Sequence, residues 1–348
     1  MKVTHEPAKA PTPSQSGFLP NREIVEPVAS QATAGQASNV GLPASHAESS
    51  EERQAAAVQT RQHPSARAFI KKHAVLAFYV LVFALAWGPI LINAPGAFLG
   101  TTDLLGTDAE LTSAAEVDPL MLAGAPSITL AAILVIALAF GRVGLRDLRS
   151  RVIRWRVGVR WYAVALLTYP LLMTAILFAL SLTSEAFLPG IVTAEDKASL
   201  LVTGLVAGLF ASLFEEIGWT GFATHELSKR HGLLATGLIV GLPWCLVHLP
   251  LIAGADSGAV PQALSVAVSL FAVLLPYRVL MVWVYGHTQS VLLAMLMHLP
   301  TSAGAFILVS AAMVGVPDLI FNLVFGATLW VLVAAVAAAN RRKLSFVT

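Results

Sequence analysis

Residues 200–222 read LLVTGLVAGLFASLFEEIGWTGF, a hydrophobic stretch that is interrupted by two adjacent carboxylates, Glu215 and Glu216. About 20 apolar residues are enough to cross the roughly 30 Å hydrocarbon core of a bilayer as a helix. An ionisable group at that depth is costly and is usually retained for function. The stretch therefore predicts both a membrane helix and a functional site within it.

The whole chain has the composition of an integral membrane protein. Its 348 residues are 56% hydrophobic and only 12% charged, whereas soluble domains carry about one quarter charged residues. We therefore expect membrane lipids as partners. The formal net charge of +2 gives no reason to expect nucleic acid. Cys245 is the single cysteine, which excludes an intrachain disulfide and a multi-cysteine metal cluster.

Hydrophobic runs of spanning length recur along the chain after residue 72, with polar, Gly-containing or Pro-containing breaks between them. We predict an all-α fold, a polytopic membrane bundle of about eight transmembrane helices. The expected spans are His73–Asn93, Leu120–Phe140, Trp161–Thr183, Leu200–Phe222, Leu234–Ala253, Leu264–Tyr285, Ser290–Val314 and Leu319–Ala339.

Four regions follow from this pattern. Residues 1–68 are rich in Ala, Ser, Gln and Pro, and we expect them to form a disordered cytoplasmic arm. Residues 69–198 should hold three transmembrane helices and an Arg-rich cytoplasmic loop at 141–160. Residues 199–314 should form the core that carries the chemistry. Residues 315–348 should form the last transmembrane helix and a basic tail.

The Arg-rich segment 141–160 sets the expected orientation, since it contains many arginines and only one acidic residue, Asp147. Lys and Arg are enriched on the cytoplasmic side of membrane proteins. With an even number of spans both termini are then cytoplasmic, and we expect a multi-pass protein of the plasma membrane. The segment could also be an interfacial helix that binds anionic lipid headgroups, which would place it on the same side.

Two later hydrophobic stretches each carry a histidine. His248 lies in LPWCLVHLP, residues 242–250, with Trp244 one helical turn earlier and prolines on both sides. Because proline leaves backbone carbonyls without helical donors, His248 could simply bond such a carbonyl. His298 is followed one turn later by Ser302, whose hydroxyl can face the same space.

Together the carboxylate pair and the two histidines form a candidate hydrolytic set. Adjacent carboxylates in a low dielectric do not both ionise easily, which suits a general base. They could activate water with an imidazole, or a divalent metal such as zinc, held by Glu215, His248 and His298, could do so. The sequence leaves both routes open. A carboxylate pair that merely bonds a polar network is the structural alternative.

At these residues the chain resembles the CPBP family of intramembrane endopeptidases, which includes the CAAX prenyl endopeptidases, bacteriocin-processing and self-immunity proteins, and Abi-type proteins. The resemblance covers residues 200–314. Three ordered motifs carry it, namely Glu215-Glu216-Ile217-Gly218-Trp219-Thr220-Gly221-Phe222, Trp244-x-x-x-His248, and Thr288-x-Ser290 leading to His298-x-x-x-Ser302.

The resemblance implies a role for each candidate residue. Glu215 and His248 would activate the attacking water, and Glu216 would support them. His298 and Ser302 would stabilise the oxyanion that forms on the scissile carbonyl. A hydrophobic or lipidated peptide or protein would be the substrate.

Two positions depart from the family pattern, because Thr220 stands where arginine is frequent and Ser302 where asparagine is usual. Arg278, inside the sixth hydrophobic run, could pair with Glu215 or Glu216 in place of the missing arginine. The departures motivate one alternative, a catalytically silent scaffold or immunity-type protein of the same fold. A proton-coupled transporter is a further alternative, but it predicts internal repeats, which the two halves of the sequence do not display.

Overall fold

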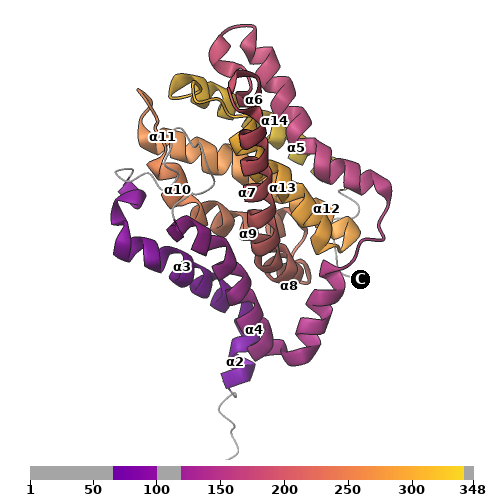
Figure 1. Cartoon of the computed structure of the whole chain (residues 1–348). Coiled ribbons are helices and arrows are strands. Elements are labelled where there is room, and N and C mark those ends of the chain that lie inside the picture. The colour runs from indigo at the N-terminus through magenta and orange to yellow at the C-terminus, as the bar shows by residue number, and fades with distance from the viewer. Residues whose placement is uncertain (1–65, 100–118, 341–348) are drawn as a thin grey trace, which may run out of the picture. The chain divides into compact units, whose positions relative to one another are not determined.

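The computed structural model describes residues 66–99 and 119–340, and every regular element within those two ranges is helical (Figure 1). The chain divides into two units, Met1–Arg61 and Gln62–Thr348, and all the described residues belong to the second. The expected arm at 1–68 lies outside the described residues, apart from its last three, which begin a helix. The basic tail at 341–348 also lies outside them.

The elements follow one another along the chain as helices with short connections. They are α2 (Ala66–Lys72), α3 (Ala74–Asn93), η1 (Pro95–Leu99), α4 (Pro119–Val152), α5 (Val159–Ser181), η3 (Glu185–Phe187), α6 (Gly190–Thr193), α7 (Lys197–Gly218), η4 (Trp219–Thr224), α8 (His225–Ser228), α9 (Leu233–Val247), α10 (Leu249–Gly254), α11 (Gln262–Ala267), η5 (Val268–Leu274), α12 (Leu275–Thr288), α13 (Val291–Ile307) and α14 (Val316–Ala339). Of these, η4 and η5 are π-helical turns inside longer helical runs.

The prediction of an all-α membrane bundle is confirmed. Among the described residues, six helical runs are long and apolar enough to span a membrane, and α9 and α13 are shorter apolar helices at the fifth and seventh expected positions. Large apolar side chains on the outer faces of these helices are exposed, as lipid-facing side chains are. The six runs are Ala74–Asn93, Gly124–Val152, Val159–Ser181, Lys197–Ser228, Gln262–Thr288 and Val316–Ala339.

Two expected spans are shorter than the sequence predicted. The fifth was expected as one helix to Ala253, but α9 ends at Val247 and α10 begins at Leu249. Pro250 has no backbone N–H to continue α9, and the N–H of His248 bonds the carbonyl of Cys245. The seventh was expected to reach Val314, but α13 ends at Ile307. The next carbonyl, that of Leu308, instead accepts the backbone N–H of Gly190 at 3.0 Å.

The Arg-rich segment was expected as a cytoplasmic loop over 141–160 or as an interfacial helix, and most of it is helical. It is helical up to Val152, after a break at Gly141, whose φ of 63° and ψ of −153° suit glycine. In the C-terminal part of α4, which follows Gly141, Arg151 is buried and donates to the carbonyl oxygen of Gly221 at 2.7 Å. That carbonyl belongs to the π-helical η4, where regular backbone bonding is disturbed. One arginine therefore has a structural role beyond setting topology.

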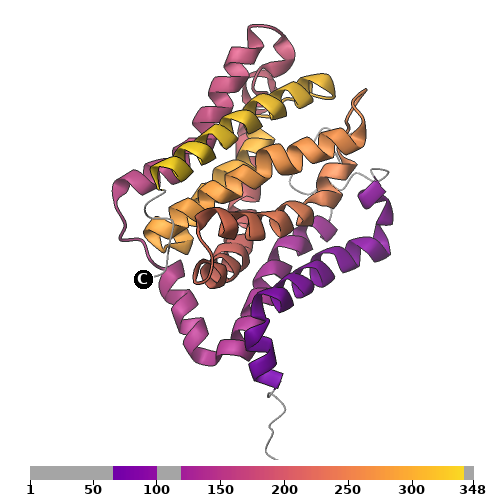
Figure 2. The same cartoon turned by 180° about the vertical axis from the view of Figure 1, so that it is seen from behind.

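Two large apolar clusters make up most of the interior of the described residues. One joins α5, α12, α13 and α14, and the other joins α3, α4, η4 and α9. The run from α11 to α12 is the most enclosed, since 56% of its apolar window is buried against 22–33% in the other five spanning runs. Seen from behind, α14 lies along η5 and α12 (Figure 2). The residues of the candidate site lie where the two clusters meet.

Candidate active site

Three helical segments bring the predicted residues together. The last turn of α7 carries Glu215 and Glu216, the junction between α9 and α10 carries His248, and α13 carries His298 and Ser302. Segments that are far apart in the sequence thus supply neighbouring side chains.

Glycines on α7 allow α13 to approach closely enough for this. A Cβ on Gly208 would lie 2.6 Å from the carbonyl oxygen of Leu299, and one on Gly204 would lie 2.6 Å from the Ile307 side chain. Such distances permit only glycine, as is common where membrane helices pack tightly. The close approach places Glu216, near the end of α7, against His298.

Glu216 is the anion at the centre of a buried polar network. Its Oε1 accepts hydrogen bonds from His298 Nδ1 and Arg278 Nη2, both at 2.8 Å. Its Oε2 accepts from Arg278 Nη1 at 3.0 Å and from the hydroxyl of Thr220. The side chains of Glu216 and Arg278 are completely buried. A two-pronged guanidinium–carboxylate pair of this kind is the strong form of an ion pair, and it fixes both partners.

Glu215, the neighbouring carboxylate, has a different environment. Its Oε2 accepts a hydrogen bond from Trp244 Nε1 at 3.1 Å. Within residues 66–99 and 119–340 it makes no ion pair, and no hydrogen bond to its Oε1 is seen. The structure therefore divides the pair into one fully compensated carboxylate and one that keeps an acceptor oxygen available.

Trp244 connects the members of the set. Its ring meets the rings of His248 and His298 edge to face, with centroids 5.2 and 5.7 Å apart. The Arg278 guanidinium lies 4.3 Å from its centroid, a cation–π contact. The indole thus packs against both imidazoles, holds Glu215 through its N–H, and covers the buried cation.

His248 is half-buried at the helix junction, where its backbone N–H bonds Cys245 O at 3.1 Å instead of the carbonyl one full turn back. The ring Nδ1 instead forms a hydrogen bond with that carbonyl oxygen, Trp244 O, at 2.7 Å. The bond to a carbonyl that the sequence suggested is therefore present. Because a carbonyl only accepts, Nδ1 carries the proton, and Nε2 of the neutral ring is left as an acceptor. The structural bond and a catalytic role are compatible.

Ser302 and Thr220, the two departures from the family pattern, have different surroundings. Thr220 is buried and bonds Glu216, and its Oγ1 lies 3.4 Å from Arg278 Nη1. The cation that the resemblance places at position 220 is therefore supplied from α12. Ser302 is half-buried one turn after His298, and its hydroxyl has no hydrogen bond among the described residues.

The proposed zinc ligands do not form a metal site as they are arranged. Within the described ranges no group of three or more His, Cys, Asp or Glu side chains is placed to hold a metal ion. His298 directs Nδ1 to Glu216 and His248 directs Nδ1 to a backbone carbonyl. The donor set Glu215, His248 and His298 therefore does not fit zinc in this conformation.

A second polar cluster closes the arginine-bearing end of the bundle. His225 Nδ1 lies 3.0 Å from the Tyr285 hydroxyl, which also accepts a hydrogen bond from Arg151 Nη1 at 3.2 Å. Arg151 pairs with Asp147 at 2.8 Å. These contacts tie α4 to α8 and α12 and leave His225 in a structural network, outside the candidate set.

Sequence reasoning missed one feature of the site and left another undecided. The connecting role of Trp244 could have been suspected from its position one turn before His248. The partner of Arg278 was left open between Glu215 and Glu216, and the structure selects Glu216. A charged residue inside a hydrophobic run was the signal that an acidic partner existed.

Comparisons with known proteins point to the same region. Residues 197–304 match the family described as type II CAAX prenyl endopeptidase Rce1-like. The chain is also 31% identical over 94 residues to CAAX prenyl protease 2 of Methanococcus maripaludis. That match covers 26% of this chain and 35% of the relative, so the chain spans about a third of the length of the curated protein that it matches.

Proposed function

Because this chain belongs, through residues 197–304, to the type II CAAX prenyl endopeptidase Rce1-like family, we propose that it is an intramembrane endopeptidase. In this proposal a water molecule activated by Glu215 and His248 hydrolyses a peptide bond. The difference between the two carboxylates is the observation that carries it: Glu216 is fully bonded, while Glu215 retains an acceptor oxygen.

The free acceptors define how water would be held. Glu215 Oε2 and His248 Nδ1 are both bonded to Trp244. Glu215 Oε1 and His248 Nε2 therefore remain as available acceptors. A water between these acceptors would pass a proton to Glu215 as its oxygen attacks the carbonyl carbon. The same proton would then reach the leaving amine.

The rest of the network would serve the developing oxyanion. Glu216 and Arg278 hold the His298 ring through Nδ1, so the orientation of its Nε2 is fixed. A protonated His298 could donate from Nε2 to the oxyanion, and the Ser302 hydroxyl is available as a second donor. Preorganised donors of this kind typically contribute about 10²–10³-fold to the rate.

The substrate follows from the location of the site and from the relatives. A site between membrane helices suits a peptide that carries a hydrophobic or lipidated segment. The relative's name specifies a CAAX prenyl protease. We therefore propose a hydrophobic or prenylated peptide as the substrate class of this chain.

The test is cleavage of a farnesylated fluorogenic peptide by the purified protein in proteoliposomes. Glu215→Gln removes the base but keeps the size and the hydrogen bond from Trp244, so we expect cleavage to fall about 10²–10⁴-fold. Glu195→Gln, which neutralises an exposed glutamate before α7, is the matched control and should cleave normally. Cleavage at the wild-type rate by Glu215→Gln would refute the mechanism.

Metal dependence is tested separately. Because the donor set does not fit zinc as arranged, we expect cleavage to survive 1,10-phenanthroline, and we expect metal analysis of the purified protein to find zinc well below one ion per chain. Activity that is lost on chelation and restored by zinc would instead require the three side chains to rearrange around a metal.

The silent-scaffold alternative rests on Thr220 and Ser302. Arg278 weakens it, since the cation that Thr220 lacks reaches Glu216 from another helix. Under that alternative the wild-type chain would not cleave the farnesylated peptide in the same assay. A protein that cleaves without any substitution at 220 or 302 excludes it.

A further inference from the structure

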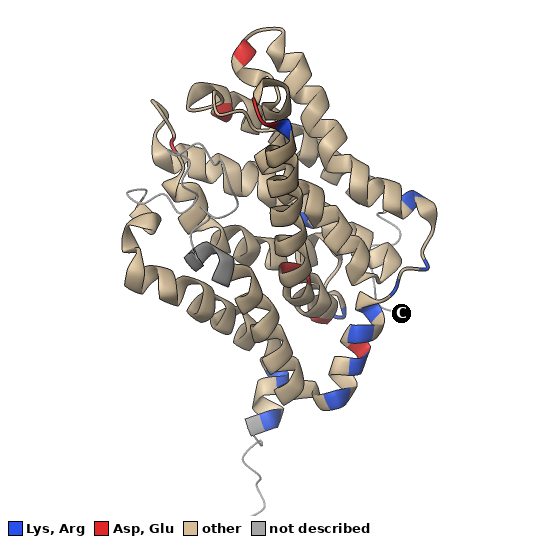
Figure 3. Cartoon of the chain, viewed as in Figure 1, with Lys and Arg blue, Asp and Glu red and all other residues tan. Residues whose placement is uncertain are grey.

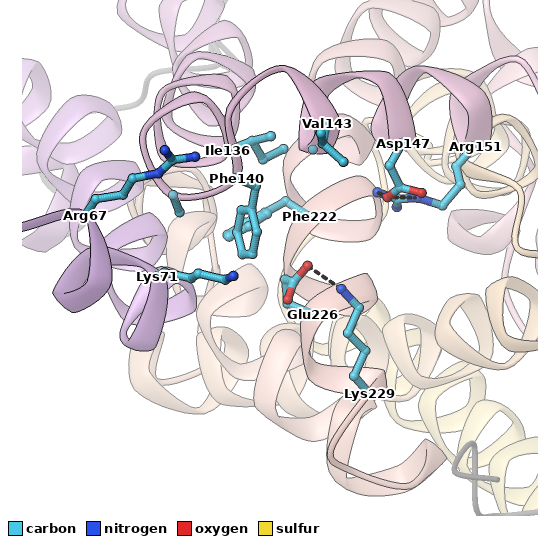
Figure 4. A pocket seen from close by; sticks show the side chains of 12 residues that line it. Arg67, Lys71, Ile136, Phe140, Val143, Asp147, Arg151, Phe222, Glu226 and Lys229 are labelled. Carbon is cyan, nitrogen blue, oxygen red and sulfur yellow. Dashed lines mark hydrogen bonds and ion pairs between the residues drawn. The ribbon is translucent and has the colours of Figure 1, made fainter. Parts of the chain in front are cut away.

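A pocket of about 400 Å³ lies where α2, the break in α4 and α8 meet, apart from the candidate active site (Figure 4). None of the five predicted catalytic residues lines it. Its lining combines six apolar or small residues with four basic and two acidic ones, namely Ile136, Ala139, Phe140, Val143, Gly144, Phe222, Arg67, Lys71, Arg151, Lys229, Asp147 and Glu226.

The pocket lies at the level where several spans end. The span of α3 begins at Ala74, directly after α2, while the runs containing α4 and α8 end at Val152 and Ser228. Lys and Arg residues gather around α2, the C-terminal part of α4 and the start of α5 (Figure 3). Ends of spans that share a concentration of basic residues mark the boundary between hydrocarbon and headgroups.

The pocket carries an excess of positive charge. Lys229 and Glu226 pair at 2.6 Å and Arg151 and Asp147 at 2.8 Å, so these four charges compensate one another. Arg67 and Lys71 have no acidic partner within residues 66–99 and 119–340.

The two uncompensated side chains point toward the pocket from α2 (Figure 4). Arg67 Nη2 lies 3.3 Å from where a Cβ on Gly141 would stand, so the glycine at the α4 break makes room for it. Lys71 Nζ lies 5.9 Å from the Phe140 ring centroid. Both cations thus line a partly apolar pocket and form no ion pair with the acids of the described ranges.

A ligand for this pocket must carry an anion beside an apolar segment. Phe140, Phe222 and Ile136 supply the apolar wall, and Arg67 and Lys71 supply donors for phosphate oxygens. We propose that the pocket binds an anionic phospholipid of the surrounding membrane. Its phosphate lies between Arg67 and Lys71, and the first carbons of its acyl chains lie against Phe140 and Phe222. This lipid site does not depend on the proposed peptidase reaction.

The test uses the full chain in dodecyl maltoside, with bound lipid counted by native mass spectrometry during titration with phosphatidylglycerol. Phosphatidylglycerol should bind more tightly than phosphatidylcholine. The double substitution Arg67→Gln with Lys71→Gln should weaken phosphatidylglycerol binding roughly 30-fold, since each basic residue near an anionic headgroup contributes about fivefold. Phosphatidylcholine binding should not change.

The matched control removes two basic residues of the same region that do not line the pocket, Arg142→Gln with Arg149→Gln, both exposed on α4. It should change phosphatidylglycerol binding by less than about threefold. Equal losses in the two double variants would overturn the site, because only the overall charge would then matter. Equal binding of phosphatidylcholine, or displacement of the lipid by inorganic phosphate alone, would overturn it too.

A second variant keeps the proposal testable if the first does not fold. Val143 is exposed and lines the pocket, so Val143→Glu adds a negative charge at little cost to the interior. It should weaken phosphatidylglycerol binding while the thermal midpoint without lipid stays within a few degrees of wild type. Unchanged lipid binding by Val143→Glu would count against the pocket.

Discussion

Glu215 and Glu216 are chemically identical neighbours with opposite environments. Glu216 accepts hydrogen bonds from Arg278, His298 and Thr220 in a completely buried network. Glu215 accepts one from Trp244. The two carboxylates therefore suit the different tasks proposed for them: Glu216 positions its neighbours, and Glu215, which keeps an oxygen available, acts as the base.

The ion pair between Arg278 and Glu216 gives a prediction about stability. Arg278→Leu leaves a buried carboxylate without its cation, and breaking one side of a buried pair costs about 3–5 kcal/mol. We expect a clear fall in the midpoint of thermal unfolding in detergent. The unfolding is measured by intrinsic tryptophan fluorescence. Arg230→Leu, which removes an exposed arginine, is the control and should leave the midpoint near wild type.

A second substitution makes this prediction specific to the charge. Thr220 Oγ1 lies 3.4 Å from Arg278 Nη1, so Thr220→Arg in the Arg278→Leu background returns a guanidinium to the neighbourhood of Glu216. This double variant should recover at least half of the decrease in the thermal unfolding midpoint. A single Arg278→Leu variant as stable as wild type would show that the pair contributes little to the fold.

At the scale of the elements, the site depends on irregular helices. The last turn of α7 passes into the π-helical η4, which buries Trp219, Thr220 and Phe222, and η5 precedes α12 in the same way. Residues at such turns leave the regular 3.6-residue spacing, which is why π-helical turns are frequent at functional sites. Arg278 follows in the first turn of α12, and its side chain is completely buried.

The packing of α7 on α13 gives a prediction at this scale. A Cβ at position 208 would lie 2.6 Å from Leu299 O, so Gly208→Ala must push the two helices apart. We expect a loss of about 1–3 kcal/mol in stability. Cleavage should fall further than stability alone requires, since a shift of about 1 Å in a catalytic group can cost 10²-fold.

The matched control for this substitution is Gly88→Ala. Gly88 lies inside α3, and nothing stands within 4 Å of a Cβ placed on it. Replacing an unconstrained helical glycine by alanine is neutral or stabilising by up to about 1 kcal/mol. If Gly208→Ala behaves like Gly88→Ala in both the thermal and the cleavage assays, close approach of α7 and α13 does not position the site.

At the scale of the whole described unit, the candidate site joins the two apolar clusters. Met297 and Tyr277 belong to the cluster of α5, α12, α13 and α14, while Trp219 and Trp244 belong to the cluster of α3, α4, η4 and α9. Polar residues where the two clusters meet are enclosed by both and so avoid lipid. This explains how strongly charged side chains are accommodated in a predominantly hydrophobic bundle.

The orientation of the bundle gives the last prediction. In a Cys245→Ser background, single cysteines replace two exposed residues, Ser150 near the end of α4 and Thr183 just after α5. A membrane-impermeant maleimide added to intact cells should label Thr183→Cys but not Ser150→Cys, since arginines favour the cytoplasmic side. Opening the cells should expose the second site. Labelling of both from outside would contradict the expected topology.

The sequence by itself determined the helical membrane bundle and the approximate positions of its spans, and it suggested the residues of a candidate site. These follow from hydrophobic run lengths and from the cost of polar groups in hydrocarbon, both of which are local properties of the chain. The sequence overestimated the lengths of the fifth and seventh helices. Their ends, at His248 and Leu308, depend on hydrogen bonds that the length of a hydrophobic run does not reveal.

Only the tertiary structure decided which carboxylate is compensated, which atom of each histidine is free and which residue replaces the missing cation. Glu216 and Arg278 are 62 positions apart in the chain, and Glu216 and His298 are 82 apart. Contacts over such separations arise from how helices pack on one another, here through Gly208 and Gly204 of α7. No local pattern encodes them, so the chemistry of the site became specific only once the helices were placed together.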